Sequence, residues 1–382
     1  MLVVSLSPLH FSEGYLTLDV VLRLVSSLVL NPAISFTSLV YSTKLYTARS
    51  IPGLVSILHD WPIWTKDPTV VACLGVFGLS VGLKINEWLS RAVRNNLTRS
   101  VKLWVWTEEV VVITGGAGGL GSEVARRLSA RGTKVVLLDV APLSFDARPS
   151  VHYYKVDLSN REAVLEVKER IVKEVGNPSV LINGAGVVRA ESILDMTARD
   201  IDLTYDVNVK AHYYTTQAFL PGMIKEGHGH VITIASSTGY HQAANGVAYC
   251  SSKAAALSFH EGLTEELRYL YPTSPLSPTP SHARAVRTSV VCPAHFKTPM
   301  FEGFRNIIPE WAAPSLEVGT VAGLVAETVW SGESQHIIEP FYAKCTPLGR
   351  ALPTWLYSVI LFFAKDAMGL VKQAKDKEVK KQ

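Results

Sequence analysis

Charged residues and cysteines are scarce in this chain of 382 residues. Charged side chains make up 18% and hydrophobic ones 48%, a balance that excludes an intrinsically disordered chain. The four cysteines lie far apart without a Cys-x-x-Cys pair, which argues against a zinc ribbon or a disulfide scaffold. His228 and His230 have no further ligand pattern, so no metal site is predicted. The formal net charge is only +4, which predicts no nucleic-acid partner.

Hydrophobic residues gather instead toward the two ends. Two apolar runs, 15–41 and 69–83, precede the rest of the chain, and Asn31-Pro32 interrupts the first. The second is shorter than the roughly 20 residues that a helix needs to cross a bilayer. Neither has the pattern of a secretory signal. We therefore expect residues 1–107 to form a membrane-associated region with at least one embedded helix; a buried helix of a soluble domain is the alternative.

Positive charge follows the second apolar run. Between Lys84 and Lys102 there are five basic residues and one acid, Glu87. The positive-inside rule then places this flank, and the domain after it, in the cytosol. Asn96-Leu97-Thr98 is a glycosylation sequon. In this orientation it stays unmodified, so a glycan on Asn96 would reject the topology.

From residue 108 the chain alternates between strand and helix patterns. This alternation predicts an α/β fold, a doubly wound parallel sheet of the Rossmann type over residues 108–345. Residues 271–285 hold four prolines and are expected to form an inserted surface loop. The predicted strands are 110–114, 134–139, 152–156, 179–183, 230–234 and 287–291.

The C-terminal region, 346–382, is predicted to contain an apolar helix and a Lys-rich tail. Residues 353–364 are apolar on all sides but too short to span a bilayer comfortably. Two interpretations fit equally well. One is an interfacial helix with a basic end, and the other is a helix packed on the domain or in a dimer interface.

A glycine-rich turn lies between the first strand and the next helix. Thr114–Gly121 reads TGGAGGLG, and glycine lets backbone N–H groups approach a pyrophosphate at the helix N-terminus. Asp139 ends the second strand, where a carboxylate binds the adenosine ribose hydroxyls and repels a 2′-phosphate. Val140 follows it, and the turn contains no Arg or Lys. The sequence therefore favours NAD(H) over NADP(H) as cofactor.

Four further residues complete a recognisable pattern. Tyr249 and Lys253 lie one turn apart on a predicted helix. Ser236 follows the strand 230–234, and Asn208 lies in the preceding long helix. With these motifs in order, the chain resembles the short-chain dehydrogenases/reductases. It is most similar to their membrane- or lipid-droplet-associated type, which includes retinol dehydrogenases and lipid-droplet 17β-hydroxysteroid dehydrogenases.

The resemblance covers about residues 105–345 and implies specific roles. The catalytic tetrad would be Asn208, Ser236, Tyr249 and Lys253. Asp157 would contact adenine, and Thr298 the nicotinamide carboxamide. Gly184 and Ala294 replace residues usual in the family, from which we expect altered loop detail rather than lost activity. The predicted cofactor-binding residues are Gly115, Gly119, Leu120, Gly121, Asp139, Asp157, Asn183, Ala185, Gly186, Tyr249, Lys253, Pro293 and Thr298.

Hydride transfer from an alcohol requires a base for the hydroxyl proton. A free phenol, with a pKa near 10, is a poor base at neutral pH. We expect the ammonium of Lys253 and a positive nicotinamide to lower the pKa of Tyr249. Ser236 would position the substrate oxygen. The resemblance further implies that Lys253 binds the ribose and that Asn208 holds a water.

Four other residues adjoin these segments. His241 and His295 could line the substrate pocket, although lone histidines are more often structural or solvated. Cys250 and Cys292 are predicted to be packing residues, because no base is evidently placed to activate them.

The sequence thus predicts an oxidoreductase that transfers hydride between NAD(H) and a lipophilic alcohol or ketone: a retinoid, a steroid or a long-chain lipid. It would act at the endoplasmic reticulum membrane or a lipid droplet, facing the cytosol. The resemblance further implies a homodimer through the helices around 201–223 and 248–271. An NADPH-dependent sphingoid or fatty-acyl ketoreductase is one alternative, against which Asp139 argues. A scaffold or nucleotide sensor without turnover is another, against which the tetrad argues.

Overall fold

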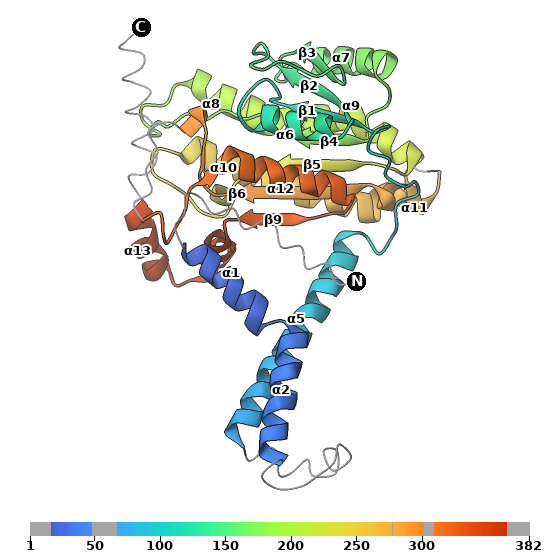
Figure 1. The fold of residues 1–382 in the computed structure, drawn as a ribbon. Coiled ribbons are helices and arrows are strands. Elements are labelled where there is room, and N and C mark those ends of the chain that lie inside the picture. Colours follow the sequence, from blue (N-terminus) through green and yellow to red (C-terminus); the bar gives the residue numbers. More distant parts are fainter. Residues whose placement is uncertain (1–16, 48–66, 277, 302–308, 365–382) are drawn as a thin grey trace. The chain divides into compact units, whose positions relative to one another are not determined.

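The computed structural model describes residues 17–47, 67–276, 278–301 and 309–364 (Figure 1). The described residues divide into two compact units, one within 16–93 and one from Arg94 onward. The predicted Lys-rich tail lies outside the described residues.

The described residues of the first unit form three helices. They are α1 (Leu18–Val29), α2 (Pro32–Thr47) and α5 (Pro68–Arg94). The axes of α1 and α2 are bent by 56° at the break between them. Pro32 explains this break, because proline has no N–H to continue α1 and its fixed φ suits the first position of a helix.

Helix α5 extends well beyond the predicted apolar run 69–83, to 27 residues. By length and composition it is able to cross a membrane, and α1 and α2 meet the same condition when taken together. The apolar run 69–83 is thus one part of a longer helix. Within the unit, Ser35 Oγ and Ser80 Oγ hydrogen-bond at 2.9 Å, and the ring centres of Phe36 and Phe77 are 5.5 Å apart.

The second unit is built on a seven-stranded sheet in the order β3-β2-β1-β4-β5-β6-β9. All of its strand pairs are parallel, which confirms the predicted α/β fold of the Rossmann type. Edge strand β9 was not predicted. The strands are β1 (Val110–Thr114), β2 (Lys134–Asp139), β3 (Val151–Lys155), β4 (Val180–Asn183), β5 (His230–Ile234), β6 (Arg287–Pro293) and β9 (His336–Glu339).

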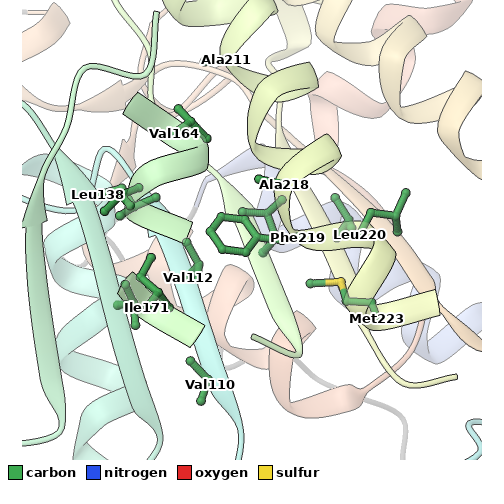
Figure 2. Packing of buried hydrophobic residues seen from close by; sticks show 14 of the residues in the cluster. Val110, Val112, Leu138, Val164, Ile171, Ala211, Ala218, Phe219, Leu220 and Met223 are labelled. Atoms are coloured by element: carbon green, nitrogen blue, oxygen red, sulfur yellow. The ribbon is translucent and has the colours of Figure 1, made fainter. Parts of the chain in front are cut away.

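Helices cover both faces of the sheet. Val111 and Ile113 of β1 pack with α6 and α12, whereas Val110 and Val112 pack with α7 and α9 (Figure 2). This alternation follows from the two-residue repeat of a strand. The helices are α6 (Gly119–Ala130), α7 (Arg161–Glu174), α8 (Ala198–Tyr205), α9 (Ala211–Glu226), α10 (Val247–Glu265), α11 (Pro280–Ala285), α12 (Val318–Ser331) and α13 (Thr354–Ala364).

The proline-rich segment 271–285 is more ordered than predicted. It contains a 3₁₀ turn, Tyr271–Thr273, and helix α11. Pro280 is the first residue of α11, where its ring is tolerated. Ala283 and Ala285 are buried, because their small side chains fit against the core. The expected surface loop is therefore partly a docked helix.

A tight turn, residues 95–98, lies at the amino edge of the sheet. Asn96 has a positive φ of 55°. Its Nδ2 donates to the carbonyl oxygen of Arg284 at 3.1 Å, and its Oδ1 accepts from Arg268 Nε at 3.0 Å. The guanidinium of Arg287, the first residue of β6, donates to two carbonyl oxygens of the turn at 2.7 and 2.6 Å. Both amide atoms of the sequon asparagine are thus used inside this unit.

The chain continues along the same edge with a buried polar pair. His228 Nε2 lies 3.1 Å from Glu109 Oε1, and His228 Nδ1 lies 3.2 Å from Ser100 Oγ. Trp104 stacks on Trp106, with ring centres 4.9 Å apart, and also contacts His228. Burial by itself would raise the pKa of Glu109, but the hydrogen bond with His228 and smaller contributions outweigh it, so this pKa is lowered.

Candidate active site

The predicted site residues follow the carboxyl ends of parallel strands. Thr114, Asp139, Asn183, Ile234 and Pro293 end β1, β2, β4, β5 and β6. The chain order reverses between β1 and β4, since β2 and β3 lie on one side of β1 and β4 to β9 on the other. In open α/β sheets such a switch point is where ligands bind.

The glycine turn combines close packing with an open side. A Cβ at Gly115 would lie 2.8 Å from Ala185 Cα, and one at Gly121 would lie 2.2 Å from the carbonyl oxygen of Gly115. At Gly118 and Gly119, in contrast, no described atom lies within 4 Å of such a Cβ. Gly118 also caps α6 without a side-chain hydrogen bond. The backbone at the start of α6 is therefore exposed at Gly118 and Gly119, and a helix N-terminus of this kind suits a phosphate.

The carboxylate of Asp139 contacts this turn directly. Its Oδ2 accepts from the Ala117 N–H at 2.9 Å, and its Oδ1 from the Ala141 N–H at 3.0 Å. Asp157 is exposed and accepts from the N–H and the hydroxyl of Ser159. Leu120 is half-buried and packs against the core beneath the turn.

Asn183 is bonded to the framework. Its Oδ1 accepts from Thr215 Oγ1 at 2.8 Å, and its Nδ2 donates to Thr216 Oγ1 at 3.4 Å. These contacts join β4 to α9. The next two residues, Gly184 and Ala185, donate their N–H groups to Thr114 Oγ1 at 2.9 and 3.0 Å. The segment after β4 is thus fixed beside the glycine turn by a hydroxyl whose role the sequence did not indicate.

Three of the four predicted catalytic residues converge. Tyr249 and Lys253 are 5% and 6% exposed on the inner face of α10. The hydroxyl of Ser236 lies close enough to the phenol of Tyr249 to act on its pKa. Lys253 Nζ donates to the carbonyl oxygen of Ile234 at 2.9 Å and lies 5.9 Å from the centre of the Tyr249 ring. Ser236 Oγ accepts from Thr238 Oγ1 at 2.9 Å.

Asn208 completes the group from a different element. It lies in a π-helical turn, Asp206–Lys210, between α8 and α9, and is fully buried. Its Oδ1 accepts from the Val187 N–H at 2.7 Å, and its Nδ2 donates to the Val187 carbonyl at 3.0 Å and to Ser252 Oγ at 2.9 Å. A Cβ at Gly186 would lie 3.5 Å from Asn208 Oδ1 and 3.7 Å from Lys253 Nζ. Asn208 therefore holds the loop after β4 against α10.

Burial controls the acidity of both titrating groups of α10. It raises the pKa of Tyr249, while the hydrogen bond with Ser236 acts in the opposite direction. The predicted lowering of the Tyr249 pKa is therefore not found without a bound cofactor, because burial removes water from the phenolate and makes this charged form unfavourable. Burial lowers the pKa of Lys253 to about 8, because a buried ammonium group loses its hydration.

Residues after β6 add a polar atom without a partner. Pro293, the last residue of β6, accepts at its carbonyl oxygen from Ser236 Oγ at 3.4 Å. Thr298 Oγ1 is buried and has no hydrogen-bond partner among the described residues. Buried hydroxyls are nearly always satisfied. This orphan hydroxyl and the open glycine turn fit a bound dinucleotide.

An apolar wall lies beside the phenol. Tyr249 packs in a cluster with Val188, Ala190 and Cys250, and the ring of Phe301 is 5.8 Å from the Tyr249 ring. The sequence did not reveal the first two wall residues or Phe301, because they lie in loops without periodicity.

The four residues adjoining the catalytic segments differ in placement. His295 contacts the Phe301 ring at 5.8 Å and the Ser315 hydroxyl at 2.9 Å. His241 is half-buried, and burial lowers its pKa. Cys250 and Cys292 are fully buried, which confirms that they are packing residues.

Comparison with known proteins finds a matching family model and similar sequences. The family model of the short chain dehydrogenases matches residues 109–307. Human estradiol 17-beta-dehydrogenase 11 is 33% identical over 262 residues, which are 66% of this chain and 82% of that protein. Human epidermal retinol dehydrogenase 2 is 38% identical over 231 residues, 58% of this chain and 71% of that protein.

A solved structure gives the same fold. A short chain dehydrogenase from Burkholderia cenocepacia, crystallised in complex with NADP, matches with a TM-score of 0.54 and 24% identity. The match covers 67% of this chain and 99% of that one.

Proposed function

Because the chain belongs to the short-chain dehydrogenase family and is an NAD(P)-dependent oxidoreductase of alcohol or ketone groups, we propose that it transfers hydride between NAD(H) and a lipophilic alcohol or ketone. The proposed substrates are retinoids, steroids or long-chain lipids. The observation that carries the proposal is the convergence of Tyr249, Ser236 and Lys253 beside an apolar wall.

Tyr249 is the proposed general acid and base. In oxidation its phenolate takes the hydroxyl proton of the substrate, while Ser236 Oγ holds the substrate oxygen by a hydrogen bond. A bound nicotinamide supplies the acceptor for the hydride. Since burial raises the pKa of Tyr249, nearby positive charge has to favour the phenolate, and the Lys253 ammonium provides it. In reduction the same phenol donates the proton.

The cofactor contacts follow from the open side of the glycine turn. The N-terminus of α6 would hold the pyrophosphate, and Lys253 the nicotinamide ribose. Thr298 Oγ1, which has no partner among the described residues, would bind the carboxamide. Asp139 lies against the turn, where its charge disfavours a 2′-phosphate. This supports NAD(H) as the preferred cofactor.

A membrane or lipid-droplet location fits both the chain and its relatives. Helix α5 is long and apolar enough to cross a bilayer. The names of two relatives specify estradiol and retinol, both apolar alcohols. We place the enzyme at the endoplasmic reticulum or a lipid droplet with its catalytic unit in the cytosol.

A homodimer through α9 and α10 is also part of the proposal. The two helices line a groove with Tyr213, Leu220, Phe259 and Leu263. Tyr213 is exposed there. A second copy of this chain would bury that apolar surface.

The test is turnover by the full chain purified in detergent. Retinol, steroids and long-chain alcohols are offered with NAD⁺ and with NADP⁺, and formation of the reduced cofactor is followed. We expect turnover with NAD⁺ on at least one lipophilic alcohol. Reduction of a keto-sphingoid or ketoacyl substrate with NADPH alone would favour the ketoreductase alternative. Absence of turnover on every substrate would favour a scaffold or nucleotide sensor.

A further inference from the structure

The last described helix, α13, carries an exposed apolar stripe. Trp355, Val359 and Phe362 are 70%, 48% and 59% exposed. Their spacing places them on one face of the helix. Large apolar side chains that are exposed together mark an interaction surface.

The stripe is tied to the catalytic site through the chain that precedes it. A 3₁₀ segment, Phe341–Ala351, leads from β9 to α13. Arg350 in this segment donates from Nε to the Tyr240 carbonyl at 3.0 Å and from Nη2 to the Gly239 carbonyl at 3.4 Å. These carbonyls belong to the loop that begins at Ser236. In Figure 1, α13 lies on the side toward which the arrow of β9 points, the carboxyl edge of the sheet.

The chemistry of the surrounding sequence favours lipid as the partner. The same chain contains a helix able to cross a membrane, so a lipid surface is within its reach. The apolar run 353–364 is shorter than the roughly 20 residues that a helix needs to cross a bilayer, which suits a helix lying in the plane of an interface. Tryptophan is typical of that level. Residues 372–382 add five lysines and two acids, which complement anionic headgroups.

We propose that the α13 face formed by Trp355, Val359 and Phe362 inserts into a lipid surface. Insertion sets the substrate edge of the sheet against the layer in which an apolar substrate dissolves. The expected effect of insertion on turnover rests on the proposed function, whereas insertion itself is measured without turnover.

Insertion is tested by labelling the full chain in vesicles. A polarity-sensitive fluorophore is attached at Val359→Cys or, as the matched control, at Ile360→Cys, which is also exposed but on another side of α13. Both variants carry Cys345→Ser, because Cys345 is exposed. In phosphatidylcholine vesicles containing phosphatidylserine, we expect lipid-borne quenchers to reduce emission several-fold more at 359 than at 360. Equal quenching at the two positions would overturn the proposal.

A kinetic arm connects insertion to substrate access. Trp355→Glu should lower kcat/KM about tenfold for a retinoid or steroid dissolved in vesicles. It should leave kcat/KM for a short water-soluble alcohol nearly unchanged, and Ile360→Glu is the control. If the stripe variant instead loses a dimer, a second copy of the chain covers the stripe and the proposal fails. If wild-type protein turns over neither substrate, the proposed function fails while the labelling result still decides the insertion.

Discussion

The amino ends of the seven strands form one edge of the sheet and their carboxyl ends form the opposite edge, and the polar groups at these two edges differ in their hydrogen bonds. At the amino edge, Arg287 and Asn96 are bonded to neighbouring chain, and His228 is paired with Glu109. At the carboxyl edge, a Cβ at Gly118 would meet no described atom within 4 Å, and Thr298 Oγ1 has no partner among the described residues. The polar groups at the amino edge thus mainly join segments of the chain to one another, whereas at the carboxyl edge an exposed glycine turn and the Thr298 hydroxyl are placed where a ligand binds in this kind of sheet.

The largest effect is expected from removal of the phenol at the open edge. Tyr249→Phe should lower kcat by about 10²–10⁴-fold, because proton transfer loses its acid and base. Binding of NADH, measured by fluorescence titration, should persist. Tyr205→Phe is a matched control, since the Tyr205 hydroxyl donates to Ser251 on α10, the helix that carries Tyr249, but Tyr205 is not part of the tetrad. Turnover by Tyr249→Phe close to that of the control would remove Tyr249 from the proposed role.

Cofactor choice gives the next largest effect. Asp139→Ser combined with Val140→Arg removes a negative charge beside the glycine turn and adds a positive one at an exposed position. The ratio of kcat/KM for NADP⁺ to that for NAD⁺ should rise about 10- to 100-fold. The measurement is steady-state kinetics with each cofactor at one fixed substrate concentration. An unchanged ratio would contradict the assignment of Asp139.

The amino edge should respond in stability and not in catalysis. Asn96→Ala removes two hydrogen bonds and leaves a non-glycine residue at a positive φ. We expect the free energy of unfolding to fall by about 1–3 kcal/mol, with KM unchanged, as measured by denaturant unfolding in detergent. Asn96→Gly loses the same two hydrogen bonds but tolerates the positive φ, so its own loss of stability measures the hydrogen bonds and the difference between the two variants measures the backbone strain. A several-fold change in KM for Asn96→Ala would remove the distinction between the edges.

The smallest effect concerns pH and the buried imidazoles. Burial lowers the pKa of His212 and of His230 to about 3, whereas in the unfolded chain each binds a proton below about pH 6.5. The unfolded state therefore binds more protons, and stability falls as pH drops from about 6.5 toward 3. Between pH 7 and 5 the Tm of His212→Phe should fall by about 2–4 °C less than that of the wild type. Parallel Tm curves would show that His212 is not a neutral buried group.

The fold was largely predictable because its signals are local. Strand β1 and strand β2 are runs of branched aliphatic residues, and both match the predicted bounds. Strand β9 was missed, since four residues that pair only with β6 give no periodic pattern. The docking of α11 was also missed, because prolines signal a turn while the burial of Ala283 depends on distant contacts.

The site residues that form short sequence motifs could be predicted, whereas contacts between distant segments could not. Tyr249 and Lys253 share a helix face, and their spacing alone brings them together. The bonds of Asn208 to the loop after β4 and the clamp by Arg350 join segments far apart in sequence. The raised pKa of Tyr249 likewise arises from burial, which no spacing reveals.

Strand β6 has one further consequence. It begins at Arg287, which grips the segment arriving from the N-terminal helices, and it ends at Pro293 beside Ser236. Seven extended residues separate these ends by roughly 20 Å. A single strand therefore connects the turn that precedes the catalytic unit with the segment that holds the reacting hydroxyl of Ser236, so a substitution at either end of β6 changes the support of the other.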